Sequence, residues 1–315
     1  GCGMNCEFCA VKGRARCATP ERLLAQISSL AEGREAREFF VVDDQFAQDR
    51  AETMRFCRML RDYCRATDQD FFLTVQIRLD CARDAELLKA MRECGIRSLA
   101  IGIESPIEEE LRAMGKALKV ADMVNLAREY HRAGFLVHGM FIFGYPMRSG
   151  VEFRMAAPER VRRFRKFIRA ARLDTVQVLL PVPLPGTELR RRLQDQGRVF
   201  SGREIGWEYY DGNFPLFSPD PPLTCENMHA AILGIMGKFY HFRRMPGLAM
   251  HTLRFPIAML PLVNLRERFR RWYRRWRNDV IGTAGYFIMK SWRRQFSEGP
   301  FQGKLDRASA AARSE

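Results

Sequence analysis

Short apolar runs alternate with longer amphipathic stretches from Thr19 to about Pro185. The apolar runs are continuous rather than alternating with polar residues, which is typical of strands buried on both faces of a parallel sheet. The stretches between them have the spacing of helices. Strands are expected at residues 38–42, 70–80, 98–105, 135–146 and 175–183. Helices are expected at residues 19–30, 50–64, 84–95, 108–114, 121–133 and 159–172.

This order predicts an α/β fold of repeated strand–helix units, a partial (β/α)6 barrel of the TIM type with a helical C-terminal extension. A helix comes first, so the first strand is expected just upstream of Gly1, and the chain is expected to be a fragment of something longer. Three regions are expected. They are a barrel core at 1–190, an irregular segment rich in prolines and aromatics with a helix that completes the core at 191–245, and a basic helical extension at 246–315.

Three of the nine cysteines lie in the opening stretch GCGMNCEFC, where Cys2, Cys6 and Cys9 have the spacing C-x3-C-x2-C. Nine is an odd number and too few for a fold built on disulfides, and no signal peptide precedes the motif, so a reducing, cytoplasmic compartment is expected. Three cysteines can hold a four-iron cluster with one iron left open. Zinc with Cys17 as a fourth ligand is the alternative.

The remaining cysteines are expected to be small core side chains rather than ligands. This group consists of Cys17, Cys57, Cys64, Cys81, Cys94 and Cys225.

Polar side chains and a glycine fall at or near the ends of the expected strands: Asp43, Asp44, Arg78, Glu104 and Gly144. In a barrel of parallel strands, active groups gather at these carboxyl ends. Other interpretations stay open for several of them. The two aspartates could cap the following helix, and Gly144 could relieve packing.

Two residues inside the expected strand at 135–146 have two interpretations each. Gly139 could approach a ligand or relieve packing. His138 could face a substrate or be a satisfied core histidine.

The chain resembles the radical S-adenosylmethionine (SAM) superfamily over roughly residues 1–220. Its signature, CxxxCxxC on the loop after the first barrel strand, matches Cys2, Cys6 and Cys9, with Phe8 as the aromatic before the last cysteine. LLPVPLPGTEL (179–189) is similar to the sixth-strand end of the cobalamin-associated members. The resemblance therefore implies that the three cysteines bind a [4Fe-4S] cluster.

The same resemblance implies a SAM site along the strand ends. VVDD (41–44) stands where the family places polar groups near the SAM amino group, although Asp-Asp replaces the common Gly-Gly-Glu. IGIES (101–105) resembles the segment whose Glu104 would reach the ribose, and HGMFIFGYP (138–146), with Gly139 and Gly144, resembles the glycine motif near the adenine. We expect Arg78 to be one of the SAM-binding residues as well.

The chemistry implied by the resemblance begins with a one-electron reductant of the flavodoxin or ferredoxin type. The reduced cluster cleaves SAM to a 5′-deoxyadenosyl radical, which abstracts hydrogen from a substrate, and this step needs no acid–base residue, so no catalytic residue is assigned. Related members act on lipids, pigments and antibiotics and often methylate unactivated carbon. With a cobalamin domain upstream, the protein would also catalyse cobalamin-dependent methyl transfer, and the methyl acceptor would be an unknown small molecule or lipid.

Two other functions stay open. An RNA-modifying enzyme of the methylthiotransferase type usually carries a second cluster and a β-rich C-terminal domain, neither of which is evident in the sequence. A non-enzymatic zinc or iron–sulfur module would leave the polar strand ends without a purpose.

The positive charge is concentrated near the C-terminus. The whole chain has a net charge of +15, and residues 241–295 hold thirteen Lys and Arg against Glu267 and Asp279, a net charge of +11. Such a segment favours an anionic partner.

Within that segment, Phe269, Trp272, Tyr273 and Trp276 form one stripe if residues 265–279 are helical. Three interpretations stay open: the stripe docks on the barrel, the region 253–294 lies on an anionic membrane surface, or it binds RNA. Nucleic acid is the least favoured because no RNA-binding signature accompanies it. A peripheral position at the inner membrane surface is the corresponding expectation for localisation.

Overall fold

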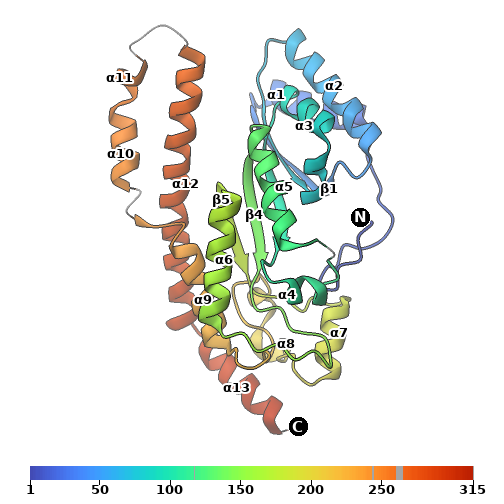
Figure 1. The fold of residues 1–315 in the computed structure, drawn as a ribbon, viewed down its shortest axis with the longest axis vertical. Helices are drawn as coiled ribbons and strands as arrows, with labels where there is room; N and C mark the ends of the chain where they lie inside the picture. The colour runs from blue at the N-terminus through green and yellow to red at the C-terminus, as the bar shows by residue number, and fades with distance from the viewer. Residues whose placement is uncertain (117, 243–244, 260–264, 315) are drawn as a thin grey trace.

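Five parallel strands form one sheet in the order in which they occur along the chain, β1-β2-β3-β4-β5 (Figure 1). The computed structural model describes residues 1–116, 118–242, 245–259 and 265–314. The strands are β1 Glu38–Phe46, β2 Phe72–Ile77, β3 Ile96–Glu104, β4 Leu136–Ile142 and β5 Thr175–Leu179. Each is connected to the next through at least one helix, so the α/β class and the barrel-like strand order are confirmed. The described strands do not close into a complete barrel.

The connecting helices begin where the sequence offers caps. They are α1 Pro20–Gly33, α2 Arg50–Ala66, α3 Ala85–Glu93, α4 Glu108–Ala113, α5 Val120–Arg132 and α6 Ala157–Ala171, with the 3-10 helix η1 Leu79–Arg83 between β2 and α3. Thr19 caps α1, where Pro20 takes the first helical position, and Asp84 caps α3. The cap of α2 is Asp49, so the interpretation of Asp43 and Asp44 as caps of this helix is wrong.

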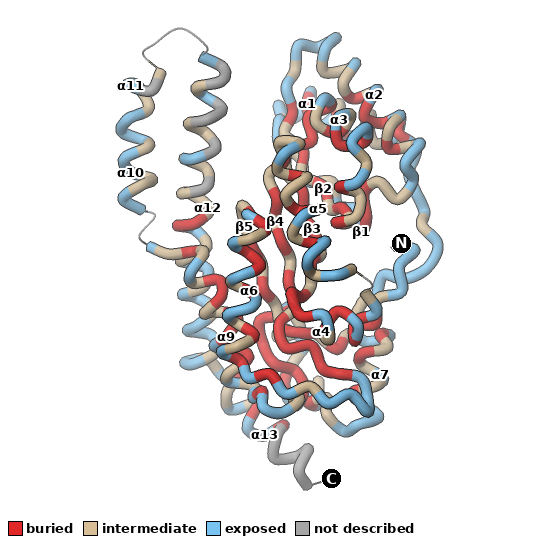
Figure 2. Tube along the Cα trace, in the orientation of Figure 1, coloured by how far each residue is buried: buried red, intermediate tan, exposed pale blue. Residues whose placement is uncertain are grey.

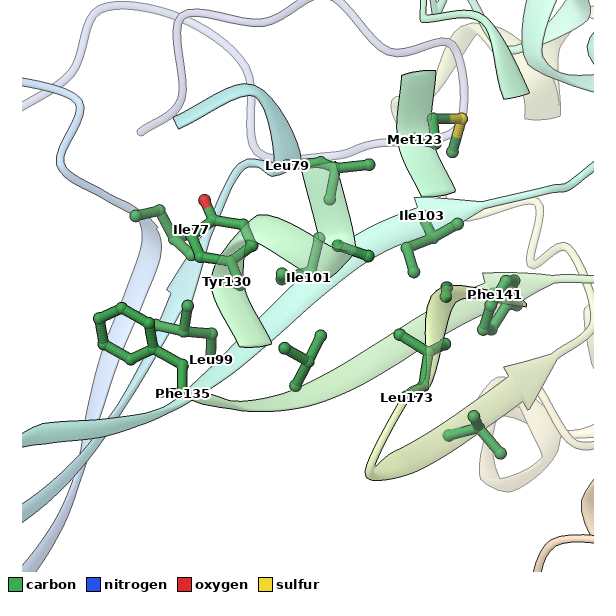
Figure 3. Packing of buried hydrophobic residues seen from close by; sticks show 14 of the residues in the cluster. Ile77, Leu79, Leu99, Ile101, Ile103, Met123, Tyr130, Phe135, Phe141 and Leu173 are labelled. Carbon is green, nitrogen blue, oxygen red and sulfur yellow. The ribbon is translucent and has the colours of Figure 1, made fainter. Parts of the chain in front are cut away.

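Much of the sheet is buried under this helical layer, as the red segments of the strands in Figure 2 show. Along β4 the alternate residues Val137, Gly139 and Phe141 are buried, whereas His138 and Met140 on the opposite face are half-buried. The Phe141 ring lies between rings of α6, and Leu99, Ile101 and Ile103 of β3 continue the same apolar layer (Figure 3). The helix layer therefore fixes one face of the sheet and leaves the other, more polar face for a ligand.

A second group of elements extends the carboxyl end of the sheet. It consists of α7 Glu188–Asp195, α8 Gly202–Ile205, η2 Trp207–Tyr209 and α9 Cys225–Gly237. After α9, the Tyr240 hydroxyl donates to the Val176 carbonyl at 2.6 Å and accepts from the Val176 N–H at 3.0 Å. These bonds satisfy backbone groups of β5, an outer strand of the sheet.

The C-terminal residues form α10 Met245–Leu253, α11 Phe255–Met259, α12 Leu265–Ser297 and α13 Phe301–Ser314. The predicted helix at 265–279 is part of α12. Its aromatic stripe packs mainly on α10 and α11: the Trp272 Nε1–H donates to the His251 carbonyl at 2.8 Å, and the rings of Trp272 and Phe255 lie 4.4 Å apart. The stripe also contacts the barrel at β1, where the Tyr273 hydroxyl donates to Glu38 at 3.3 Å.

Candidate functional site

The opening loop lies across the carboxyl ends of the strands. Gly1 pairs with Asp44 at the end of β1, and the Cys2 thiol donates to Gln45 Oε1 at 3.3 Å. Met4 contacts Arg78 after β2, since an Arg78 N–H lies 2.8 Å from the Met4 sulfur. The loop thus lies over the edge where parallel strands gather active groups.

All three cysteines of the motif are free, and each is partly buried. Burial is the main effect on Cys6 and raises the pKa of its thiol, while the nearby Lys116 lowers this pKa and Glu104, Cys9 and Cys2 raise it. Among the described residues no three His, Cys, Asp or Glu side chains already converge as a metal site. The donor set nevertheless has the number and softness that an iron–sulfur cluster requires, because three free thiols lie in one short loop.

Glu7 anchors this loop, and the sequence alone did not single it out. Its side chain is 1% exposed and its carboxylate pairs with Arg192 of α7, with 2.7 Å between Nε and Oε1. The Tyr145 hydroxyl donates to the same carboxylate at 2.6 Å. The backbone of Glu7 adds two bonds, from its N–H to the Met114 carbonyl and from the Leu189 N–H to its carbonyl, both 3.2 Å. Glu7, Arg192 and Tyr145 are called the loop clamp below.

The loop clamp holds the residue next to Cys6 at a fixed place above the sheet. We expect Glu7→Gln to destabilise the fold by about 3 kcal/mol, because Arg192 would lose the charge that compensates its partial burial. The loop would also open more often, so iodoacetamide should alkylate Cys6 and Cys9 faster in the variant. Mass spectrometry of the timed reaction measures both rates, with Glu108→Gln, an exposed carboxylate, as the control. Equal alkylation rates in the two variants would contradict the clamp.

The two aspartates of VVDD have different surroundings. Strand β1 continues to Phe46 rather than ending before Asp43, and its pairing with β2 is irregular between Val41 and Phe46. Asp43 lines a cavity of about 290 Å³ between β1 and the segment around Cys17. Asp44 lies 3.0 Å from the nitrogen of Gly1 in the opening loop. Cys17 is exposed beside this cavity, so its prediction as a core side chain is wrong.

Glu104 ends β3 in a left-handed conformation with a φ of 66°, which is strained for a residue with a side chain. Its carboxylate is 12% exposed and pairs with Lys116, with 2.8 Å between Oε1 and Nζ. Lys116 also donates to the Gly102 carbonyl at 3.1 Å. A strained backbone conformation at a carboxylate beside a cysteine loop is a feature often found at ligand sites. Lys116, like Glu7, is a residue of this region that the sequence alone did not single out.

A buried network supports the turn that follows Glu104. The Ser105 hydroxyl donates to Glu110 and accepts from the Ile107 N–H at 3.1 Å. Glu110 is fully buried and pairs with Arg160 of α6, whose Nε–H donates to the Met155 carbonyl at 2.9 Å. Burial raises the pKa of Glu110 to about 7, although Arg160 and Ser105 both lower it.

The remaining predicted residues lie in different places around this edge. Arg78 follows β2 and bonds to Asp80, with 2.8 Å between Nε and Oδ1. A Cβ on Gly139 would lie 2.5 Å from Leu173, and one on Gly144, whose φ is 74°, would lie 2.7 Å from Met228. These approaches favour the packing interpretation of both glycines.

His138 lies on the face of the sheet opposite the helices. Its Nδ1 is 2.8 Å from Thr175 Oγ1 on β5, and burial lowers the pKa of the imidazole. A neutral ring with a hydroxyl partner is compatible with both interpretations of this residue, so its role stays a prediction.

The comparisons with known proteins agree with the geometry. Residues 1–157 match the family described as "Radical SAM superfamily". The chain is 27% identical over 205 residues to the hopanoid C-2 methylase of Rhodopseudomonas palustris (strain TIE-1), a match that covers 63% of this chain and 37% of that protein. The chain thus spans less than two fifths of the length of this relative.

Two solved structures share the fold. TsrM of Kitasatospora setae, a radical SAM methyltransferase with cobalamin and a [4Fe-4S] cluster bound, has a TM-score of 0.51 and 19% identity over 62% of this chain and 38% of its own. The cobalamin-dependent radical SAM enzyme OxsB has a TM-score of 0.53 and 12% identity over 97% of this chain and 56% of its own.

No helix among the described residues combines the length and the apolar character needed to cross a membrane. The cysteine motif and the family match agree with each other. The chain belongs to the radical SAM superfamily, enzymes that use an iron–sulfur cluster and S-adenosylmethionine.

Proposed function

We propose that Cys2, Cys6 and Cys9 hold a [4Fe-4S] cluster and that SAM binds between this loop and the carboxyl ends of β1 to β3. The observation that carries the proposal is that Cys6, one of three free thiols in one loop, lies near Glu104, a partly buried carboxylate with a strained backbone at the end of β3. When bound, the cluster supplies the electron that cleaves SAM to the radical that takes hydrogen from the substrate.

The protein's own residues bind and orient SAM and the cluster and shield them from water. Glu104 accepts hydrogen bonds from the ribose hydroxyls of SAM, and the ion pair with Lys116 holds this carboxylate in place. Asp43 and Asp44, both in the last residues of β1, are the candidates for the SAM amino group. The loop clamp holds the cysteines over the sheet, so that the reacting groups meet in one orientation.

The reaction of the full-length protein is proposed from the relatives. TsrM and OxsB favour the use of cobalamin, and TsrM and the hopanoid methylase favour methyl transfer, with cobalamin held by residues outside this chain. The substrate would be a small molecule or a lipid, and a flavodoxin or ferredoxin would supply the electron. The methylthiotransferase alternative has less support, because the described residues from Cys225 onward contain helices and no strand.

The test is anaerobic reconstitution of the chain with iron and sulfide, followed by electron paramagnetic resonance (EPR) of the reduced protein with and without SAM. A four-iron signal that shifts on addition of SAM supports the proposal. One equivalent of zinc and no such signal would refute it.

Glu104→Gln is expected to weaken SAM binding by about tenfold or more, because a neutral amide is a poorer acceptor for two hydroxyls than a carboxylate. The cluster signal should persist, since Glu104 is not a cluster ligand. Equilibrium dialysis with labelled SAM measures the change. Glu109→Gln, on the neighbouring helix, is the control and should bind SAM like the wild type. Unchanged affinity in Glu104→Gln would exclude the ribose contact.

A further inference from the structure

The outer face of α10 and α11 carries large apolar side chains in contact with solvent. Met250 is 48% exposed, Leu253 78% and Ile257 65%. Their spacing of three and four residues places them on one side of the two consecutive helices. We call Met250, Leu253 and Ile257 the outer stripe.

The opposite side of these helices is already occupied by α12. His251 pairs with Asp279, with 2.8 Å between Nδ1 and Oδ2, and the Trp276 Nε1–H donates to Thr252 Oγ1 at 3.0 Å. In Figure 1, α10 and α11 lie on the far side of α12 from the sheet. The outer stripe therefore faces away from the rest of the described chain, and the barrel does not bury it.

The charge around the outer stripe has one sign. Residues 245–259 contain Arg254, which is exposed, and no Asp or Glu. Over residues 241–295 the net charge is +11, and Asp279, one of the two carboxylates, is paired with His251. An exposed apolar stripe in a segment with a high net positive charge has the character of a helix that lies in the interface of an anionic bilayer.

We propose that the outer stripe docks on an anionic lipid surface, with Leu253 and Ile257 entering the boundary between headgroups and acyl chains. The aromatic stripe of α12, for which a membrane contact was one of three open interpretations, is turned toward α10 and α11 instead. A nucleic acid fits less well, because aliphatic side chains offer neither hydrogen bonds to phosphate nor a ring for stacking. This surface lies outside the proposed SAM site, and the inference does not depend on the proposed chemistry.

The experiment is sedimentation of the 315-residue chain with two kinds of vesicles. One contains phosphatidylglycerol and phosphatidylcholine in equal parts, and the other contains phosphatidylcholine alone. The chain should sediment with the anionic vesicles and be released by salt, because exposed charges are screened. The double variant Leu253→Glu and Ile257→Glu should bind the anionic vesicles about tenfold or more weakly, since it places two charges in the apolar stripe.

Val151→Glu is the matched control. Val151 is 52% exposed in the loop between β4 and α6, away from α10 and α11, and the variant should bind like the wild type. Circular dichroism should show the same helix content in all three proteins.

Three results would overturn the proposal. The first is that the wild type does not sediment with anionic vesicles. The second is that the double variant binds these vesicles as tightly as the wild type. The third is that Val151→Glu loses as much vesicle binding as the double variant. Analytical ultracentrifugation without lipid provides one more outcome. A dimer that the double variant abolishes would assign the outer stripe to a second copy of the chain.

Discussion

Cys6→Ser is expected to lose most of its iron and its reduced four-iron EPR signal after anaerobic reconstitution. A cluster with three protein ligands has no spare thiolate, and a serine hydroxyl is a hard, weakly acidic ligand that binds iron poorly at neutral pH. Cys6 is the central cysteine of the motif, and its thiol responds to the charges of both Cys2 and Cys9. The measurements are iron and sulfide analysis and the EPR spectrum.

Cys17→Ser is the matched control for this experiment. Cys17 is also a free cysteine, exposed and only a few residues beyond the motif. The cluster hypothesis requires Cys17→Ser to keep its iron, whereas a zinc site with four cysteines requires both variants to lose metal. Equal metal loss in the two variants, with zinc as the metal found, would replace the cluster by a structural zinc site.

Arg160→Met should cost about 3–5 kcal/mol of unfolding free energy near pH 8, because it leaves the Glu110 carboxylate buried without its cation. The cost should be smaller near pH 6. The pKa of Glu110 is raised to about 7 in the folded chain from an ordinary value of 4.5, so the folded state binds the extra proton. Its contribution to stability is thus fully present below pH 4.5 and is lost as the pH rises through 7. Without Arg160 this pKa rises further, and the loss above pH 7 becomes larger.

Urea unfolding of the wild type and the variant at several pH values measures this dependence. Arg163→Met, an exposed position on the same helix that pairs with Glu159, is the control and should change stability by less than about 0.5 kcal/mol at any pH. A cost in Arg160→Met that is the same at pH 6 and pH 8 would show that the lost interaction is packing rather than charge. The Phe153 ring, which lies 4.9 Å from the Arg160 guanidinium, would then be the relevant partner.

Much of the core could be predicted because its signals are local. Continuous apolar runs mark β1 to β5, and caps such as Thr19 and Asp84 lie within a few residues of the helices that they begin. The strand ends were less certain, because an apolar run continues into a loop without a change of pattern. The predicted strand at 135–146, for example, ends at Ile142, and the turn after it contains Gly144 with a positive φ.

The contacts of the C-terminal helix could not be predicted from the sequence. The period of Phe269, Trp272, Tyr273 and Trp276 predicted a helix and one aromatic face, and the helix is confirmed. The pattern could not say what this face contacts, since a barrel, a bilayer and a neighbouring helix all bury aromatic rings. That α10 and α11 cover it is a contact between separate helices, which the spacing within one helix does not record.

The sequence by itself determined the α/β class, the order of strands and helices, and the cysteine motif that identifies the superfamily. These depend on periodicity and short spacings, which act between residues close together in the chain. Only the tertiary structure showed that Glu7 meets Arg192, 185 residues away, and that Lys116 pairs with Glu104. Such pairs form because the parallel sheet brings the ends of separate strands to one edge, and no local pattern in the sequence records which charges will meet there.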